Sequence, residues 1–89
     1  MAYTVEFSKE AVADVERLKR NNPELLKKLA KLIVEVGSHP RSGTGQCERL
    51  KGVEAETWSR RINQRHRLVY EIYDERIVVL IVSAYGHYE

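Results

Sequence analysis

The chain has little cysteine, little proline and no long apolar run, and each shortage excludes a class of protein. A single cysteine, Cys47, occurs among the 89 residues, which excludes an internal disulfide and the paired spacings of a zinc site. The most apolar run, residues 77–82 (IVVLIV), has the length of a strand and cannot span a bilayer, and the N-terminus lacks the apolar stretch of a signal peptide. We therefore expect a cytoplasmic protein with no membrane contact, no metal and no cofactor.

Acidic residues are also scarce in one part of the chain. Residues 58–70 (WSRRINQRHRLVY) contain four arginines and one histidine but no Asp or Glu. Over residues 41–70 the chain has seven Lys or Arg against three acids, although the whole protein has a net charge of only +2. Such local clustering of positive charge indicates an anionic partner more strongly than the net charge does.

The length and the composition, with 43% apolar and 31% charged residues, are those of one globular domain covering residues 1–89. The predicted elements make it an α+β domain. Alternation predicts a strand at 2–7, and helical spacing predicts two single-faced helices, the first capped by Ser8. Asn22 and Pro23 are predicted to open the second helix and Gly37 to end it. After a loop at 38–46, strands are predicted around 47–50, 57–62, 67–73 and 77–84. We expect both helices to pack on one face of a mostly antiparallel sheet of four or five strands.

The basic run is predicted to form a β-hairpin whose turn is residues 63–65. Pairing outward from that turn places Trp58 opposite Tyr70 on an apolar face and Arg61 opposite Arg67 on the other face. Like charges directly across a strand pair destabilise it by up to about 1 kcal/mol, which favours a sheet face built to hold an anion. The alternative is a solvated strand face that only keeps the sheet soluble.

A plausible set of groups for metal-free RNA cleavage is also present. That reaction needs a base for the 2′-OH, an acid for the leaving 5′-oxygen and cations for the phosphoryl charge. Glu48 and His87 could transfer the protons, Arg61 and Arg67 could bind the phosphate, and Tyr88 could stack on a base. Each residue also has a structural explanation, because a surface Glu, a solvated His and a packed Tyr are common.

Three motifs carry a resemblance to a known family. The stretch GTGQCERLKG, the stretch WSRRINQRHRLVYEI and a chain that ends in His-Tyr plus one residue closely resemble the YoeB/Txe type of toxin. These toxins belong to the RelE/ParE superfamily of bacterial toxin–antitoxin systems. The resemblance extends from the first strand to the terminus and implies a RelE-like fold with element order β-α-α-β-β-β-β.

The resemblance also implies an activity, namely a ribosome-dependent mRNA interferase that cleaves the message in the 30S A site. The 2′-OH would attack the adjacent phosphate without a metal and leave a 2′,3′-cyclic phosphate. By similarity, Glu48 is the general base, Arg67 the cation at the transition state, His87 the general acid and Tyr88 the residue that orients the nucleotide. The residues expected to bind RNA and its phosphates are Lys51, Arg60, Arg61 and Arg65.

The expected partners are mRNA on the ribosome, a YefM/Axe-type antitoxin that covers the basic face, and a second copy in a homodimer. The sequence departs from the family pattern where Gln46-Cys47 replaces the usual Lys-Pro, and where Glu89 follows the usual final Tyr. The alternative function is a non-enzymatic toxin of the same fold, such as a ParE-like gyrase inhibitor, or a module that only binds antitoxin.

Overall fold

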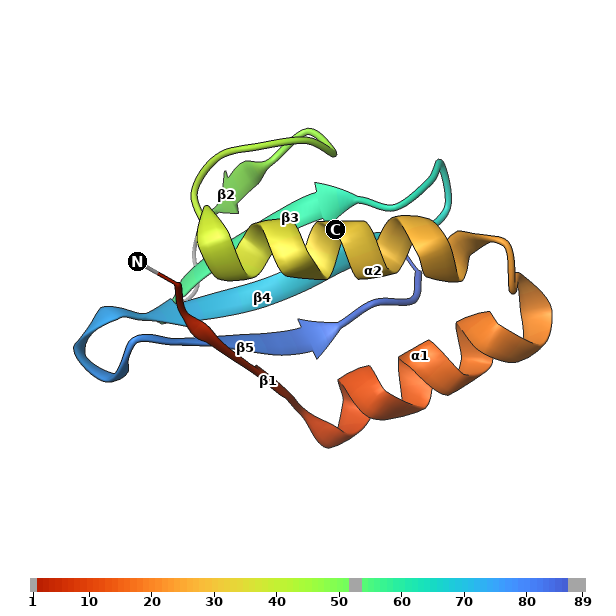
Figure 1. Ribbon diagram of the computed structural model, residues 1–89, viewed down its shortest axis with the longest axis horizontal. Helices are drawn as coiled ribbons and strands as arrows, with labels where there is room; N and C mark the ends of the chain where they lie inside the picture. Colours follow the sequence, from red (N-terminus) through yellow and green to blue (C-terminus); the bar gives the residue numbers. More distant parts are fainter. Residues whose placement is uncertain (1, 52–53, 87–89) are drawn as a thin grey trace.

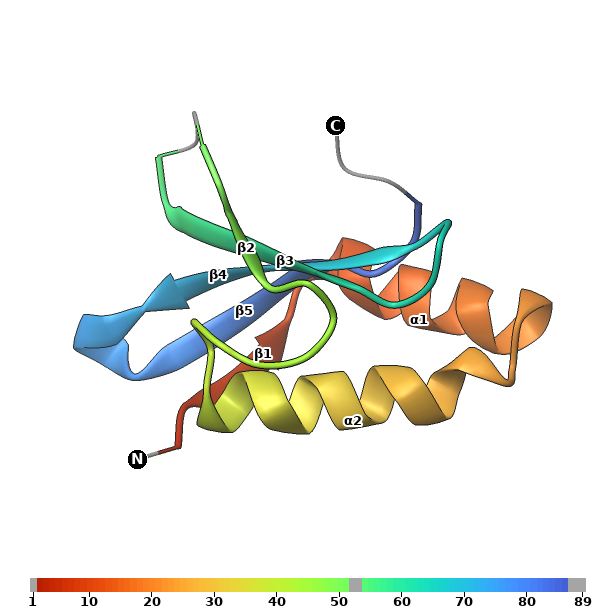
Figure 2. The ribbon, with the colours of Figure 1, turned by 90° about the horizontal axis from the view of Figure 1, so that it is seen from above.

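The order of elements along the chain places two helices between the first strand and the remaining four. The structure is a computed structural model that describes residues 2–51 and 54–86. The elements are β1 (Thr4–Phe7), α1 (Lys9–Asn21), α2 (Leu25–Ser38), β2 (Glu48–Leu50), β3 (Glu56–Arg61), β4 (Arg67–Tyr73), η1 (Asp74–Arg76) and β5 (Val78–Ser83). The strands form one sheet in the order β1-β5-β4-β3-β2, and both helices cover the same face of it (Figures 1 and 2). The predicted α+β class is confirmed.

The two helices begin for different reasons. Ser8 caps α1 as predicted, because its hydroxyl accepts a hydrogen bond of 3.0 Å from the backbone N–H of Ala11. The prediction that Asn22 opens α2 is wrong. Asn22 is the C-cap of α1, and α2 begins at Leu25 after a turn in which the Leu25 N–H donates to the Asn22 carbonyl over 2.9 Å. The Asn22 N–H donates to the Leu18 carbonyl over 2.7 Å, and this bond keeps Asn22 with the preceding helix.

Gly37 does not end α2, which continues to Ser38. Its carbonyl accepts a 2.8 Å hydrogen bond from the N–H of Tyr3, and a Cβ there would lie 3.2 Å from the side chain of Val5. The glycine therefore lets β1 approach the helix closely, which is a packing role that sequence reasoning mistook for a stop signal.

The strand pairings confirm the predicted hairpin. Trp58 lies opposite Tyr70, and Arg61 lies opposite Arg67. The β2–β3, β3–β4 and β4–β5 pairs are antiparallel, and only β1 runs parallel to its neighbour β5. The sheet is thus mixed but mostly antiparallel, as expected.

The core lies between the helices and the covered face of the sheet. Leu29, Leu32 and Val36 of α2 are buried against strand residues such as Leu68 and Ile81. The opposite face of the sheet has no helix over it (Figure 2). Side chains on that open face that are not buried by their neighbours, such as Arg61 and Arg67, are therefore available to a ligand, whereas Ser59 is buried there. Within the described residues, neither helix is long and apolar enough to cross a membrane.

Candidate functional site

The open face of the sheet holds an acid on β2 and an arginine on β4, the two strands that flank β3. Glu48 on β2 is paired directly with Ser59 on β3, so both side chains point to the same face. Arg67 on β4 reaches that serine, because its Nε and Nη2 atoms donate to the Ser59 hydroxyl over 3.1 and 2.8 Å. The buried serine holds the guanidinium beside the strand that bears Glu48. A third contact, from Arg67 Nη2 to the Gln46 carbonyl at 3.4 Å, ties it to the segment before Glu48.

A second arginine adds to the positive charge of this face. Arg61 is exposed and sits opposite Arg67, so two guanidinium groups come from one strand pair and point to one side. Arg65 is exposed in the β3–β4 turn, and Lys51 is exposed just beyond β2. None of these four cations takes part in an ion pair with another described residue. They are therefore free to bind an anion such as phosphate.

The chain that follows β5 is fixed next to Arg67 by two backbone hydrogen bonds. The Arg67 N–H donates to the Gly86 carbonyl over 3.1 Å. The Gly86 N–H in turn donates to Nδ1 of the buried His66 over 2.8 Å. Gly86 immediately precedes His87 in the sequence, and its backbone is thus held at the arginine end of the open face. His87 and Tyr88 themselves lie outside the described residues.

Arg60 does not belong to this face, which corrects the expectation that it binds RNA phosphate. Its side chain is 0% exposed on the helix-covered side. The guanidinium forms an ion pair with Glu35 and donates to the carbonyls of His39 and Ser42 over 2.5 and 2.7 Å, while Nε donates to the Tyr70 hydroxyl over 3.0 Å. Every polar edge of the guanidinium is thus satisfied inside the protein.

This network organises the loop that leads into β2. Tyr70 donates in turn to the carbonyl of Pro40 over 2.6 Å, so three carbonyls of the loop 39–42 are anchored to buried side chains. Glu35 accepts from the backbone N–H of Thr44 over 2.6 Å. That bond, with the Thr44 hydroxyl and Arg60, keeps the pKa of Glu35 below its usual value against the opposing effect of burial. The loop therefore delivers Glu48 to the open face in a defined position.

Burial acts in opposite directions on the pKa values of Tyr70 and Arg60, the two central members of the network. Burial raises the pKa of Tyr70, helped by a contact of 3.5 Å with the Cys47 sulfur. Burial alone would lower the pKa of Arg60, but its hydrogen bond to Tyr70 and the nearby acidic groups raise it above the ordinary value. Arg60 therefore stays charged, and Tyr70 stays neutral and able to donate its hydrogen bond.

Sequence reasoning missed the roles of Arg60, Tyr70 and Glu35. One signal was present, because the alternation of β3 already placed Arg60 on the same side as Trp58. A charged residue at an apolar position is stable only if partners satisfy it. The partners come from α2 and from the following loop, and no spacing in the sequence indicates that contact.

The fold and the site together define a class, which is a small α+β protein with a cationic sheet face and an acid at its edge. Residues 7–88 match the model of the YoeB-like toxin of bacterial type II toxin–antitoxin systems. The chain therefore belongs to the family of YoeB-like toxins. The predicted resemblance is confirmed.

Three relatives illustrate the match. Toxin YoeB of Synechocystis is 43% identical over 70 residues, which cover 79% of each chain. The YoeB dimer from Staphylococcus aureus has a TM-score of 0.84 and 31% identity, covering 99% of this chain and 100% of that one. The YoeB-YefM complex from the same organism has a TM-score of 0.80 and 32% identity with the same coverage. The two Staphylococcus aureus structures share the whole fold with this chain.

Proposed function

We propose that this toxin is a ribosome-dependent mRNA endoribonuclease. The observation that carries the proposal is the arrangement around Ser59. Glu48 is its partner on β2, Arg67 on β4 donates to its hydroxyl, and the Arg67 N–H holds Gly86, which precedes His87. An acid, a fixed guanidinium and an imidazole are the groups that cleavage by an internal 2′-OH requires. The exposed Arg61 enlarges the positive surface for the phosphate.

In the proposed reaction, Glu48 takes the proton from the 2′-OH of the nucleotide before the cut. The 2′-oxygen attacks the adjacent phosphorus, and the bond from phosphorus to the 5′-oxygen of the next nucleotide breaks. His87 donates a proton to that leaving oxygen. The products are a 2′,3′-cyclic phosphate and a free 5′-OH, and no step of the sequence uses a metal.

Arg67 acts on the charge that gathers on the phosphoryl oxygens. Its two bonds to Ser59 fix the guanidinium before RNA arrives, so little reorganisation is needed at the transition state. Arg61, Arg65 and Lys51 bind neighbouring phosphates. Tyr88 stacks on a base and sets the angle of attack.

The same face supports proposals about partners. The A site of the 30S subunit presents the message as single-stranded codon, the form in which an exposed sheet face can bind it. Because a YoeB-YefM complex and a YoeB dimer exist for the Staphylococcus aureus relative, we propose a YefM-type antitoxin for this chain and self-association as a dimer. An acidic antitoxin segment that folds on binding would fit the cationic face. These reactions would take place in the cytoplasm.

The test is a map of mRNA 5′ ends after brief induction in a bacterium, repeated with purified protein and programmed ribosomes. Wild type is expected to cut within codons in the A site. Glu48→Gln and His87→Ala are expected to reduce the cleavage rate at least about 10²-fold, because each removes a proton-transfer group. The matched controls are Glu16→Gln on α1 and His39→Ala after α2. Each changes only an exposed side chain. Both controls should cut normally.

Other outcomes would contradict the proposal. Equal growth arrest and equal cutting by wild type and His87→Ala would remove His87 from the mechanism. Inhibition of gyrase supercoiling by the purified protein, with no RNA cut on any ribosome, would replace the ribonuclease by a gyrase-directed toxin.

A further inference from the structure

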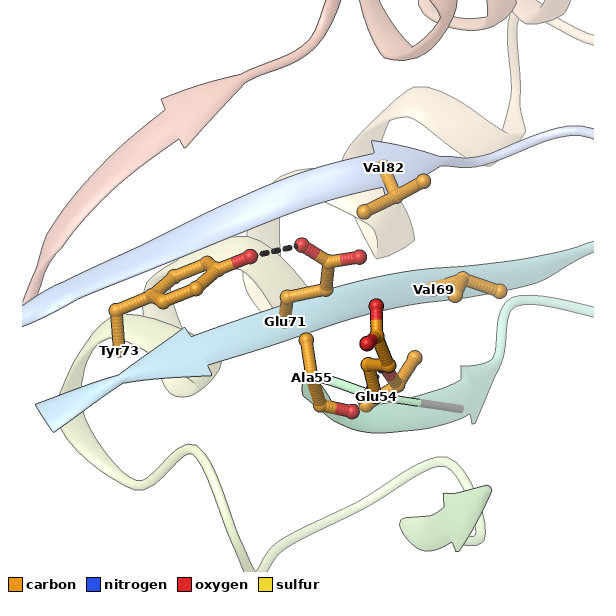
Figure 3. A pocket seen from close by; sticks show the side chains of 7 residues that line it. Glu54, Ala55, Val69, Glu71, Tyr73 and Val82 are labelled. Carbon is orange, nitrogen blue, oxygen red and sulfur yellow. Dashed lines mark hydrogen bonds between the residues drawn. The ribbon is translucent and has the colours of Figure 1, made fainter. Parts of the chain in front are cut away.

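A hollow of about 420 Å³ lies on the open face, beyond the residues assigned above. It is bordered by the end of the β2–β3 connection and by β3, β4 and β5, and Figure 3 shows its side chains arranged around the middle of β4. Its lining residues are Glu54, Ala55, Thr57, Val69, Glu71, Tyr73 and Val82. The hollow therefore combines small apolar surfaces with two carboxylates and one phenol.

The hydrogen-bond acceptors of the hollow are its two carboxylates, because the Thr57 hydroxyl already donates to the Ala55 carbonyl over 2.9 Å. Tyr73 donates its hydroxyl hydrogen to one carboxylate oxygen of Glu71, as drawn in Figure 3. That bond raises the pKa of Tyr73, so the phenol stays protonated. The free lone pairs of Glu71 and the whole carboxylate of Glu54 remain available as acceptors. Two negative charges exclude a phosphate and favour a flat group that offers N–H donors.

The hollow adjoins the proposed catalytic groups. Val69, on its border, lies opposite Ser59, the residue that holds Arg67. Successive same-face residues of a strand are roughly 7 Å apart, so Val69 is one such step from Arg67 and Glu71 is two. A base attached to a phosphate bound at Arg67 can therefore reach the hollow, while its phosphate stays on the cationic side.

We propose that this hollow binds a nucleobase that flanks the scissile phosphate and selects bases with amino hydrogens over uracil. The inference rests on the proposed ribonuclease function and adds a substrate preference to it. Guanine fits best, because its N1–H and N2 amino group both donate to a carboxylate. Cytosine and adenine each offer one amino group with two hydrogens, whereas uracil offers a single N3–H flanked by two carbonyl oxygens that the acids repel. The partly exposed Val82, beside the buried Val69, offers the base an apolar contact.

The first experiment measures binding without cleavage. The purified protein is titrated with 2′-O-methyl trinucleotides GUG, CUC, AUA and UUU, which lack the attacking hydroxyl, and amide shifts are followed by NMR. We expect shifts at Glu71, Tyr73 and Val82, with GUG bound roughly fivefold or more tightly than UUU. In Glu71→Gln and Glu54→Gln the carboxylate becomes an amide that also donates hydrogen bonds. The ratio of the affinities for the guanine and uracil trinucleotides should therefore fall towards one. Glu16→Gln should keep the wild-type ratio.

The second experiment reads the bases that flank each cut in the 5′-end map. Wild type should favour guanine and disfavour uracil on one side of the cut, and Glu71→Gln should lose that preference while still cutting. An unchanged preference in both acid variants would overturn the base site and leave the ribonuclease intact. Selective trinucleotide binding without any cleavage would support the base site and refute the ribonuclease. Stronger shifts with Nα-acetyl-arginine amide than with any trinucleotide would overturn the proposal in favour of a cationic protein partner.

Discussion

At the scale of the residue, two adjacent arginines have opposite roles. Arg60 is fully buried among Glu35, Tyr70 and loop carbonyls, whereas Arg61 is exposed on the open face opposite Arg67. The difference arises because neighbouring residues of a strand point to opposite faces. A buried charge is tolerated only with partners, and an exposed one remains available for a ligand.

Methionine at each position separates these two roles. Arg60→Met keeps the length of the side chain but leaves Glu35 and the loop carbonyls without their donor, so the free energy of unfolding should fall by about 3 kcal/mol. Arg61→Met removes the repulsion with Arg67 and should change stability by less than about 0.5 kcal/mol. Urea unfolding followed by tryptophan fluorescence measures both. Equal losses in the two variants would contradict the burial of Arg60.

At the scale of the element, α2 is held by its apolar stripe rather than by its caps. Its N-cap Glu24 makes no side-chain capping bond, so the helix depends on burial against the sheet. Leu32 is 2% exposed in that interface, whereas Val34 on the outer side is 71% exposed. The same helix carries Glu35, so its position also determines the loop that precedes Glu48.

Truncation of Leu32 and of Val34 to alanine should change the free energy of unfolding by very different amounts. Leu32→Ala removes buried methyl groups and leaves a cavity, so we expect a loss of about 2–5 kcal/mol in the free energy of unfolding. Val34→Ala replaces an exposed β-branched residue by the best helix former and should be neutral or slightly stabilising. Thermal unfolding of both variants is the measurement, and a comparable loss at Val34 would mean that another surface covers this face.

At the scale of the whole molecule, charge is sorted by face and by end. The open face has its arginines near the β3–β4 turn and its acids towards the other end, at Glu71 and Glu54. Beyond them, Arg41 joins β3 to the β4–β5 turn through ion pairs of 2.7 Å with Glu56 and Asp74. Apart from Glu48, which lies at the arginine end, this segregation would give an RNA strand bound as proposed one direction in which phosphates meet cations and a base meets acids.

The acids in ion pairs make stability depend on pH. Hydrogen bonds from Arg41 keep the pKa of Glu56 below the ordinary value of 4.5, and the hydrogen bond from the Thr44 backbone does the same for Glu35. Because the folded pKa is depressed, the unfolded chain binds protons first as the pH falls. The contribution of Glu56 and Glu35 to the free energy of unfolding is therefore complete well above pH 4.5 and is lost at lower pH.

Urea midpoints measured from pH 7 to pH 3 test this dependence. We expect a plateau at the upper end and a decline once the pH falls below about 4.5. Glu56→Gln should be less stable than wild type at pH 7 and should show a shallower decline, because one of the titrating groups is gone. A decline as steep as that of wild type would show that Glu56 does not contribute.

The sequence by itself determined the class of fold, the hairpin and its register. With the turn at residues 63–65, alternation pairs the partly buried Trp58 with the buried Tyr70, and this same register places Arg61 opposite Arg67. Motif resemblance indicated the family, which the match over residues 7–88 confirms. Helix boundaries were less certain, because Asn22 and Gly37 each have a second use, as the cap of the preceding helix and as a site of close strand packing.

Only the tertiary structure decided which of the residues predicted to act on RNA lie on the same face of the sheet. Glu48 and Arg67 are brought together by the strand order β2-β3-β4 and by the shared neighbour Ser59. The burial of Arg60 and the hollow at Glu71 likewise depend on segments far apart in the chain. The physical reason is that local patterns specify the face to which a side chain points, whereas its partners are set by long-range packing, which periodicity does not encode.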